Sequence, residues 1–439
     1  MNGIRGTPKT GLLGATLGFF FGFAAVSLFG PTAHRFEEAM GLSPVLVGLL
    51  VAAPALSGSL LRIPFGAWVD GNGGRKPFLV LLILSFLGMT GLLLVIHALY
   101  PENLTSAYYP LVLLLGVLSG CGIATFSVGI GQVSYWFPQR RQGWALGVYA
   151  GLGNVAPGLF AFLLPIALVY WGLSGSYLAW LVLLGTGIVV YFISGRNAPY
   201  FQLRAHDIPA QAAKEEARGR GQELFPLEGG STAGLTLAAG VWKTWALVFV
   251  YFTTFGGFIA LTAWFPTYWT RYFGVGLGTA GLLTALYSVG ASLIRVYGGL
   301  VSDRLGGENT LIGSLSLTVV GALILTVSGL YGLSIVGAIL MAVGMGVANA
   351  AVFKLVPQEV PDAVGGAAGW VGGLGAFGGF AIPPLMGLFV DLQGAAGYAT
   401  GFVTFIGLGL GSLVLGLVVR RSRSPAGVAV TAAGSRGAN

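Results

Sequence analysis

Long, almost uninterrupted apolar stretches recur from one end of the chain to the other, and they limit the possible folds more than any other feature. A helix that crosses the hydrocarbon core of a bilayer needs about 20 apolar residues in succession. Because connections in helix bundles are short, 439 residues have room for about twelve such spans and one longer loop. The stretches lie near residues 11–31, 44–68, 78–99, 109–131, 143–170, 175–194, 240–266, 277–300, 310–330, 332–353, 364–390 and 396–419. The sequence therefore predicts an all-α polytopic membrane protein.

The composition rules out a water-soluble fold. Charged residues make up 8% of the chain and apolar residues 55%, whereas a soluble domain carries about 25% charged residues. The 74 glycines fit a membrane bundle, because small residues let helices approach closely where no hydrophobic force drives them together. The single cysteine, Cys121, leaves neither a disulfide partner nor a set of metal ligands. We therefore expect no metal and no cofactor.

The positions of the lysines and arginines predict the orientation of the spans. The first apolar run follows a short basic leader and is succeeded at once by another span, as in a retained first helix. If both termini are cytoplasmic, the cytoplasmic side collects Arg5, Lys9, Arg75, Lys76, Arg140, Arg141, Arg196, Arg204, Lys214, Arg218, Arg220, Lys243, Arg304, Lys354, Arg420, Arg421, Arg423 and Arg436. Only Arg35 and Arg271 then face outside, which is the bias expected of a multi-pass protein of the prokaryotic inner membrane. The net charge of +8 follows from this topology, so no nucleic-acid partner is expected.

A polar stretch divides the chain into two sets of six helices. Residues 196–239 contain the charged run KEEARGRGQE and several small residues, which predicts a solvated cytoplasmic linker. The chain would then consist of an N-terminal half at 1–195, the linker, a C-terminal half at 240–420 and a cytoplasmic tail at 421–439.

An internal repeat supports this division. LLRIPFGAWVDGNGG at 60–74 matches SLIRVYGGLVSDRLGG at 292–307, around the end of the second helix of each half. YAGLGNVAPG at 149–158 matches VGGLGAFGGF at 371–380, at the fifth helix of each half. Duplicated halves around a site at the membrane midplane are typical of one large class of transporters.

Arg62 and Arg295 occupy equivalent places in the first repeat. Each lies about eight residues from the cytoplasmic loop, which is about 12 Å into a hydrocarbon core about 30 Å thick. An arginine at this depth costs about 2.5–3.5 kcal/mol on insertion scales and needs compensation. Every Asp and Glu of the chain falls in a loop, in the linker or at a helix end, so no carboxylate is expected at that depth.

Two uncompensated guanidinium groups predict a cavity that binds an anion. The guanidinium presents a planar fork of donors that matches a planar oxyanion, which a lysine cannot reproduce. The alternative is that each arginine bonds to helix carbonyls, water or lipid headgroups and only positions its helix.

The chain resembles the nitrate/nitrite porters of the major facilitator superfamily, the NarK-like proteins. Their two glycine-rich nitrate signatures are matched by GVYAGLGNVAPG at 147–158 and GWVGGLGAFGGF at 369–380. The segments VSYWFPQRRQGWALG at 133–147 and VFKLVP at 352–357 are also similar to the family. The resemblance covers essentially the whole membrane region. It implies the major facilitator fold, with twelve transmembrane helices in two pseudo-symmetric six-helix halves, and transport of nitrate, nitrite or both.

The resemblance also implies the residues of a substrate site. Arg62 and Arg295 correspond to the paired nitrate-binding arginines of the family. The stretch YFTTFGGF at 251–258 suggests Tyr251 and Phe255 as pocket residues, and Phe126 takes the place of a ring that packs against the nitrate plane. The matched signature residues are Asn154, Gly151, Gly153, Gly373 and Gly375. From the first helix, either Phe20 or Phe23 is expected to contribute.

The sequence departs from the family in two places. The second signature has Ala376 where the first has Asn154, so only one half supplies that amide. Asp70 is followed by Gly71, where a basic residue is expected. The residues expected to form charge contacts at the cytoplasmic gate are Asp70, Arg75, Asp303 and Arg304; alternatively, they only anchor the topology.

Simpler explanations exist for several of these residues. The glycine runs can serve packing alone, since small residues at helix crossings are ordinary. By composition alone, Tyr251, Phe255 and Phe126 are core residues, and only the family pattern assigns them to a site. Asn154 can equally be a hydrogen-bonding residue between helices.

The predicted mechanism is alternating access around a midplane site. An empty cavity with two unpaired guanidinium groups resists closure, which favours nitrate/nitrite antiport over nitrate/proton symport. A membrane-embedded carboxylate or histidine, the usual proton carrier, is absent from the predicted site, but symport stays open as an alternative.

Other functions remain open as well. One is a carrier for another small anion, such as a carboxylate or an organic phosphate. Another is a receptor that binds without translocation, although the short linker contains no recognisable signalling domain. No nucleophile, base and orienting residue are grouped as in an enzyme. The partners expected are nitrate, nitrite and the lipid bilayer, with the monomer as the functional unit.

Overall fold

The computed structural model describes residues 4–226, 231–360 and 363–422, and every regular element within them is a helix. Hydrocarbon offers no water to the backbone, and a helix satisfies its own N–H and C=O groups. The helices of the first half are α1 (Pro8–Phe23), α2 (Ala33–Met40), α3 (Pro44–Leu60), α4 (Arg62–Asn72), α5 (Arg75–Leu99), α6 (Tyr109–Ser119), α7 (Thr125–Trp136), α8 (Gln139–Gly153) and α9 (Ala156–Ser194). Those of the second half are α13 (Trp242–Tyr251), α14 (Gly257–Phe273), α15 (Leu277–Leu305), α16 (Gly307–Val327), α17 (Tyr331–Glu359), α18 (Val364–Leu374), α19 (Gly378–Gln393), α20 (Gly397–Thr400) and α21 (Val403–Arg421).

The described residues contain the twelve predicted spans. Eleven continuous segments are long and apolar enough to cross a membrane, and one of them, Trp144–Ser194, has 51 residues. At 1.5 Å per residue this segment is more than twice as long as a bilayer core is thick. It is divided at Gly172, whose φ of 62° and ψ of −170° are not helical. The two parts are the predicted spans 143–170 and 175–194, joined with almost no loop.

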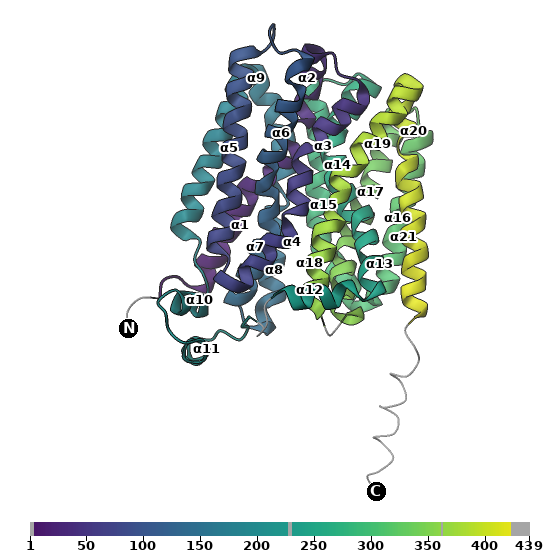
Figure 1. Ribbon diagram of the computed structural model, residues 1–439. Helices are drawn as coiled ribbons and strands as arrows, with labels where there is room; N and C mark the ends of the chain where they lie inside the picture. The colour runs from purple at the N-terminus through teal and green to yellow at the C-terminus, as the bar shows by residue number, and fades with distance from the viewer. Residues whose placement is uncertain (1–3, 227–230, 361–362, 423–439) are drawn as a thin grey trace.

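The two halves lie side by side in the bundle (Figure 1). Helices of the first half, in purple and blue, occupy one side, and most helices of the second half, in green and yellow, occupy the other. One end of the bundle carries α10, α11 and α12 together with the beginning of α1 and the end of α21; we call it the linker end. The opposite end carries α2 and α20. Most of the predicted tail, 421–439, lies outside the described residues.

The predicted solvated linker contains three short helices, α10 (Pro199–Arg204), α11 (Ala210–Gly219) and α12 (Ser231–Ala239). Phe201 of α10 is buried against the ring of Tyr135, with 4.9 Å between ring centroids. Helix α12 packs on α18, where Trp370 Nε1 donates to the main-chain oxygen of Leu235 at 2.9 Å. The linker is therefore more than a solvated chain, because it contains short helices that pack on the bundle. Helices of this length are too short to be recognised as membrane spans in the sequence.

Several spans are interrupted near their middle, and the interruptions position the candidate site. Helix α3 ends just before Arg62, which begins α4. A 3-10 turn, η4 (Gly120–Ala124), precedes Phe126, and a π turn, η5 (Phe252–Gly256), contains Phe255. Asn154 follows the last residue of α8, and a second 3-10 turn, η7 (Gly375–Phe377), interrupts the second signature. Such breaks free backbone groups and are tolerated at membrane depth only inside the protein, which is why transporters use them around substrates.

Candidate functional site

Arg62 is the most deeply buried charged side chain of the site, with 1% of its surface exposed. Its Nε donates to the oxygen of Gly58, one helical turn earlier, at 3.0 Å. Its Nη1 donates to the oxygen of Gly372, in the second signature of the other half, at 3.0 Å. Its Nη2 is buried and has no hydrogen-bond partner among the described residues. Helix carbonyls thus satisfy two of the three guanidinium nitrogens and leave one free to bind a ligand.

Arg295 belongs to α15 and reaches the same region from the second half. Its Nη1 is buried and, like Nη2 of Arg62, lacks a partner in the part of the chain that the structure describes. The guanidinium carbon lies 5.7 Å from the ring centroid of Phe255 and 5.8 Å from that of Phe353. None of the ion pairs recorded among the described residues involves Arg62 or Arg295. The two charges therefore face aromatic rings and not carboxylates.

Phe255 is the ring that both arginines share. The guanidinium carbon of Arg62 lies 5.2 Å from the Phe255 centroid and 4.8 Å from the centroid of Phe126. Tyr251 stacks on Phe255 at 4.8 Å, with 9° between the ring planes. Phe126 lies 5.9 Å from Phe255. The structure thus brings together the two arginines and the three rings that the resemblance implied.

The first helix contributes Phe23 and not Phe20. The Phe23 ring stacks on Phe255 at 6.5 Å with 8° between planes, and it is fully buried. The ring contacts of Phe20 are with Phe21 and Phe160 and not with the rings of the site.

Three further rings surround the site that the sequence did not single out: Phe19, Tyr149 and Phe353. Phe19 packs between Phe126 and Tyr149, at 5.4 and 5.1 Å. The Tyr149 hydroxyl donates to the oxygen of Thr125 at 2.8 Å, next to Phe126. Phe353 meets Tyr251 edge to face at 5.1 Å. Tyr149 lies in the segment 147–158 and Phe353 in the segment 352–357, both of which resemble the family. This resemblance is the sequence feature from which the two rings could have been predicted.

Asn154 is buried, with 2% of its surface exposed, and its Oδ1 has no partner among the described residues. Its main-chain oxygen accepts from Ser292 of α15 at 3.1 Å, which connects the two halves. The side chain itself is thus not the hydrogen-bonding link between helices that the simpler explanation proposes.

Three of the four signature glycines hold helices against residues of the site. A Cβ on Gly153 would overlap the ring of Phe19, and one on Gly375 would lie 2.7 Å from Cδ1 of Tyr251. A Cβ on Gly373 would lie 2.6 Å from the side chain of Ile63, next to Arg62. Gly151 differs, because its nearest neighbour would be Val296 at an ordinary 3.8 Å. At these three positions, the close packing that glycine allows also places the side chains of the site.

Several of these residues carry buried polar atoms that lack a hydrogen-bond partner among the described residues. The buried side-chain atoms without a partner in the described structure include Arg62 Nη2, Arg295 Nη1, Tyr251 OH, Asn154 Oδ1, Ser288 Oγ and Asn349 Oδ1. A buried polar atom without a partner costs about 1–3 kcal/mol, more for a charged group. A small anion would relieve this cost at the guanidinium and hydroxyl donors, while the surrounding rings exclude water.

The four residues expected at the cytoplasmic gate lie at the linker end, and three of them have partners outside this set. Asp70 accepts a hydrogen bond from the Tyr135 hydroxyl at 2.7 Å, and Arg75 donates to the main-chain oxygen of Phe192 at 2.9 Å. Asp303 pairs with Lys354 at 2.8 Å, whereas Arg304 is exposed. Within the described chain, no ion pair joins any of the four to another.

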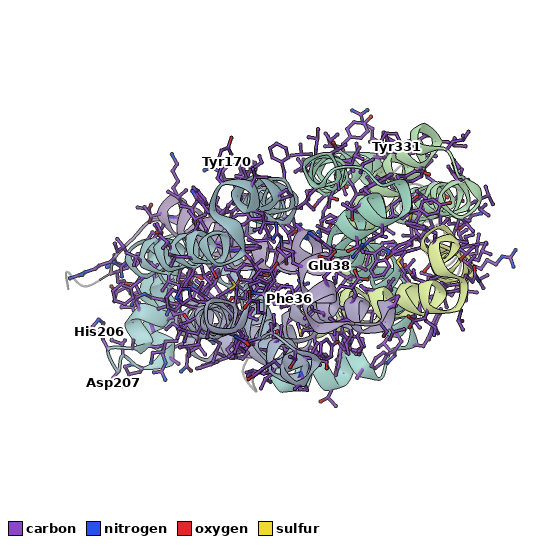
Figure 2. The ribbon with its side chains drawn as sticks, turned by 90° about the horizontal axis from the view of Figure 1, so that it is seen from above. Phe36, Glu38, Tyr170, His206, Asp207 and Tyr331 are labelled. Carbon is purple, nitrogen blue, oxygen red and sulfur yellow. The ribbon has the colours of Figure 1, made fainter. Side chains whose placement is uncertain are left out.

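An ion pair between the halves lies at the opposite end. Arg271 of α14 pairs with Glu37 of α2, with 2.5 Å between Nη2 and Oε2, and lies 3.9 Å from Glu38. Seen from that end, Glu38 and Phe36 lie near the centre of the molecule, whereas Tyr170 and Tyr331 lie at its edge (Figure 2). The pair therefore joins the two halves at this end. Sequence reasoning did not single it out.

The described residues contain no group of three or more His, Cys, Asp or Glu side chains that could hold a metal ion. The chemistry that the site offers is that of fixed donors and aromatic faces.

Comparisons with known proteins agree with the fold and with the resemblance. The family model of the Major Facilitator Superfamily matches residues 15–277 and 247–438. The chain is 31% identical over 392 residues to the probable nitrate/nitrite antiporter NarK1 of Thermus thermophilus, covering 84% of this chain and 83% of that protein. It is 30% identical over 373 residues to the probable nitrate/nitrite transporter NarK2 of Mycobacterium tuberculosis, covering 84% and 86%. The xylose transporter XylE of E. coli, in a partially occluded inward open conformation, superposes with a TM-score of 0.69 over 95% of this chain and all of that one, at 15% identity.

Proposed function

We propose that this chain, which belongs to the Major Facilitator Superfamily, carries nitrate and nitrite across a membrane by alternating access. The proposal rests on one observation above all: Arg62 and Arg295 share the ring of Phe255, each with a buried and unpaired guanidinium nitrogen. The relatives named as nitrate/nitrite transporters supply the substrate class.

A planar anion fits these groups better than a bulky one. The free donors of the two arginines and the Tyr251 hydroxyl can bind the oxygens of nitrate or nitrite as charge-assisted hydrogen bonds. The buried rings of Phe126 and Phe255 offer flat faces to the anion. A tetrahedral phosphate or a carboxylate with a long substituent would have to displace these rings.

The location of the site suits alternating access. Its residues come from both halves, several of them at interruptions of the spans, and a site of this kind can be exposed to either side when the halves rock. In this proposal the moving bodies are residues 1–195 and 240–420, joined by the linker at 196–239. The linker end faces the cytoplasm of a prokaryotic cell and the membrane is the inner membrane, as the arginine and lysine bias favours.

The site also favours exchange of one anion for another. Closing an empty cavity would desolvate two guanidinium groups, which is costly without a compensating charge. Each return of the carrier would therefore need a second anion, and nitrite is a smaller planar oxyanion with the same charge as nitrate. Among the described residues no ion pair links either arginine to a carboxylate that could carry a proton in place of the anion.

The experiment is uptake of labelled nitrate into proteoliposomes. The lumen is either empty or filled with nitrite, with and without an imposed proton gradient. Uptake that requires internal nitrite and ignores the gradient supports exchange. Gradient-driven uptake into empty vesicles would replace exchange by proton symport. If nitrate is not taken up but a carboxylate or an organic phosphate is, the substrate class is wrong.

A further inference from the structure

A second buried amide, that of Asn349 on α17, lies on the helix face that lines the aromatic cluster. Asn349 is 3% exposed, and its Oδ1 has no hydrogen-bond partner in the described parts of the chain. In a membrane bundle a buried amide usually bonds across to another helix. Because no such bond is made here, a structural role as interhelical link does not account for it.

The helical register gives the direction in which Asn349 points. Residues four apart lie on one face of a helix, so Met345, Asn349 and Phe353 form a single row along α17. At one end of this row, Phe353 packs against Tyr251 at 5.1 Å and lies 5.8 Å from the guanidinium carbon of Arg295. Asn349 lies one turn away from this point.

The other end of the row meets the same cluster. The Tyr287 hydroxyl donates to the sulfur of Met345 at 3.2 Å. Tyr287 stacks on Phe258, which in turn stacks on Phe255 at 5.8 Å. Phe353, one neighbour of Asn349 in the row, therefore contacts a ring of the candidate site, and Met345, the other neighbour, is connected to Phe255 through Tyr287 and Phe258. The amide lies between them, on the face of α17 that is turned toward the site.

The second half lacks an amide at the position where the first half has one. Asn154 belongs to the first signature, and the matching position of the second signature is Ala376. Asn154 and Asn349 have the same state in the structure, since each is almost completely buried and each has an unpartnered Oδ1.

We propose that Asn349 is a substrate-contacting residue that supplies the amide of the second half, donating from Nδ2 to an oxygen of the bound anion. This inference rests on the proposed transport of nitrate and nitrite, and it adds a specificity residue to that site. A neutral amide is suited to this place, because a carboxylate would pair with Arg295 and occupy the site permanently.

The test compares Asn349→Leu and Asn349→Asp with the wild type in two measurements. One is nitrate uptake into nitrite-loaded vesicles, and the other is the shift in melting temperature that nitrate causes in the purified protein. Asn349→Leu is expected to raise the KM for nitrate about threefold to tenfold, as for the loss of one hydrogen bond, with little change in the maximal rate. Asn349→Asp is expected to abolish the nitrate-induced shift while leaving the melting temperature without nitrate equal to or above that of the wild type.

A matched control is Ser334→Ala on the same helix. Ser334 is also a buried polar residue, but it lies near the opposite end of α17, about 22 Å from Asn349 along the helix axis. Its replacement is expected to leave the KM unchanged.

The outcomes separate the two proposals. If the wild type responds to nitrate and both Asn349 variants have the wild-type KM and nitrate-induced shift, the role of Asn349 is overturned and the proposed function stands. If Asn349→Asp lowers the melting temperature but keeps the nitrate-induced shift, Asn349 is structural. If the wild type itself neither takes up nitrate nor is stabilised by it, nitrate is not the ligand and both proposals fail.

Discussion

Arg62 in the first half donates from Nη1 to the main-chain oxygen of Gly372 in the second half, at 3.0 Å. This hydrogen bond joins a charged group of the candidate site to the second glycine signature across the interface of the halves. An anion is a stronger acceptor than a carbonyl for a guanidinium donor. An anion bound at Nη2 that also engages Nη1 would therefore compete with a contact between the halves, which relates occupancy of the site to their relative movement.

Replacing either arginine by lysine tests the planar fork. Arg62→Lys and Arg295→Lys keep the charge but lose the paired donors, so we expect nitrate uptake to fall at least about tenfold in each, the loss of one charge-assisted hydrogen bond. Arg304→Lys is the control, because Arg304 lies on the same helix as Arg295 but is exposed. Near-normal uptake in both lysine variants would contradict the binding role of the arginines.

Two glycines of the first signature are expected to respond differently to alanine. A Cβ at Gly153 would overlap the ring of Phe19, whereas a Cβ at Gly151 would meet only Val296 at 3.8 Å. Overpacking costs about 1–3 kcal/mol, so Gly153→Ala should lower the melting temperature and raise the KM for nitrate. Gly151→Ala should resemble the wild type. Equal effects of the two substitutions would show that the ring contact is unimportant.

The ion pair between Arg271 and Glu37 is expected to favour closure at the end opposite the linker. Both side chains are partly exposed, so the pair contributes about 1 kcal/mol at most, and Glu37→Gln should shift the equilibrium between the two access states about fivefold or less. Thr267 is buried on α14, one helical turn before Arg271. The measurement is labelling of Thr267→Cys by an impermeant maleimide, in a Cys121→Ser background. Labelling should increase in Glu37→Gln. It should fall back to the level of the unchanged pair in the double variant Glu37→Arg, Arg271→Glu, in which the charges are exchanged. No change in labelling would show that the pair does not act on closure.

Two ion pairs of the second half differ in burial, and their loss should differ accordingly. Glu359 pairs with Lys243 at 2.6 Å, and its side chain is 1% exposed. Asp303 pairs with Lys354, and its side chain is 72% exposed. Breaking a buried pair costs on the order of 3 kcal/mol, so Glu359→Gln should lower the melting temperature clearly and Asp303→Asn hardly at all. A reversed order would contradict the burial argument.

The fold and the two arginines could be predicted from the sequence because their signals are strong in an apolar background. A charge within a run of apolar residues stands out, and its symmetric repetition reinforces it. The break at Gly172 also left a trace, as the gap between the spans 143–170 and 175–194.

The remaining parts of the site have no comparable signal. The chain has 28 phenylalanines and 16 tyrosines, and one such ring in a membrane span looks like another until the helix phase is known. Phe19, Tyr149 and Phe353 lie at the site because of where helices are interrupted and cross. The pairing of charges at the linker end was not predictable for a related reason, since Asp303 reaches Lys354 on a helix distant in sequence.

Phe255 is held by its stacking on Tyr251 and Phe23, and both arginines lie over it. One side chain therefore forms part of the aromatic wall of the candidate site and supports both guanidinium groups that attract the ligand. An engineer who trims this ring to admit a larger anion would loosen both cations at the same time. Selectivity and affinity cannot be changed separately at this position. A carrier that evolves toward a new substrate would have to replace several residues of the site together.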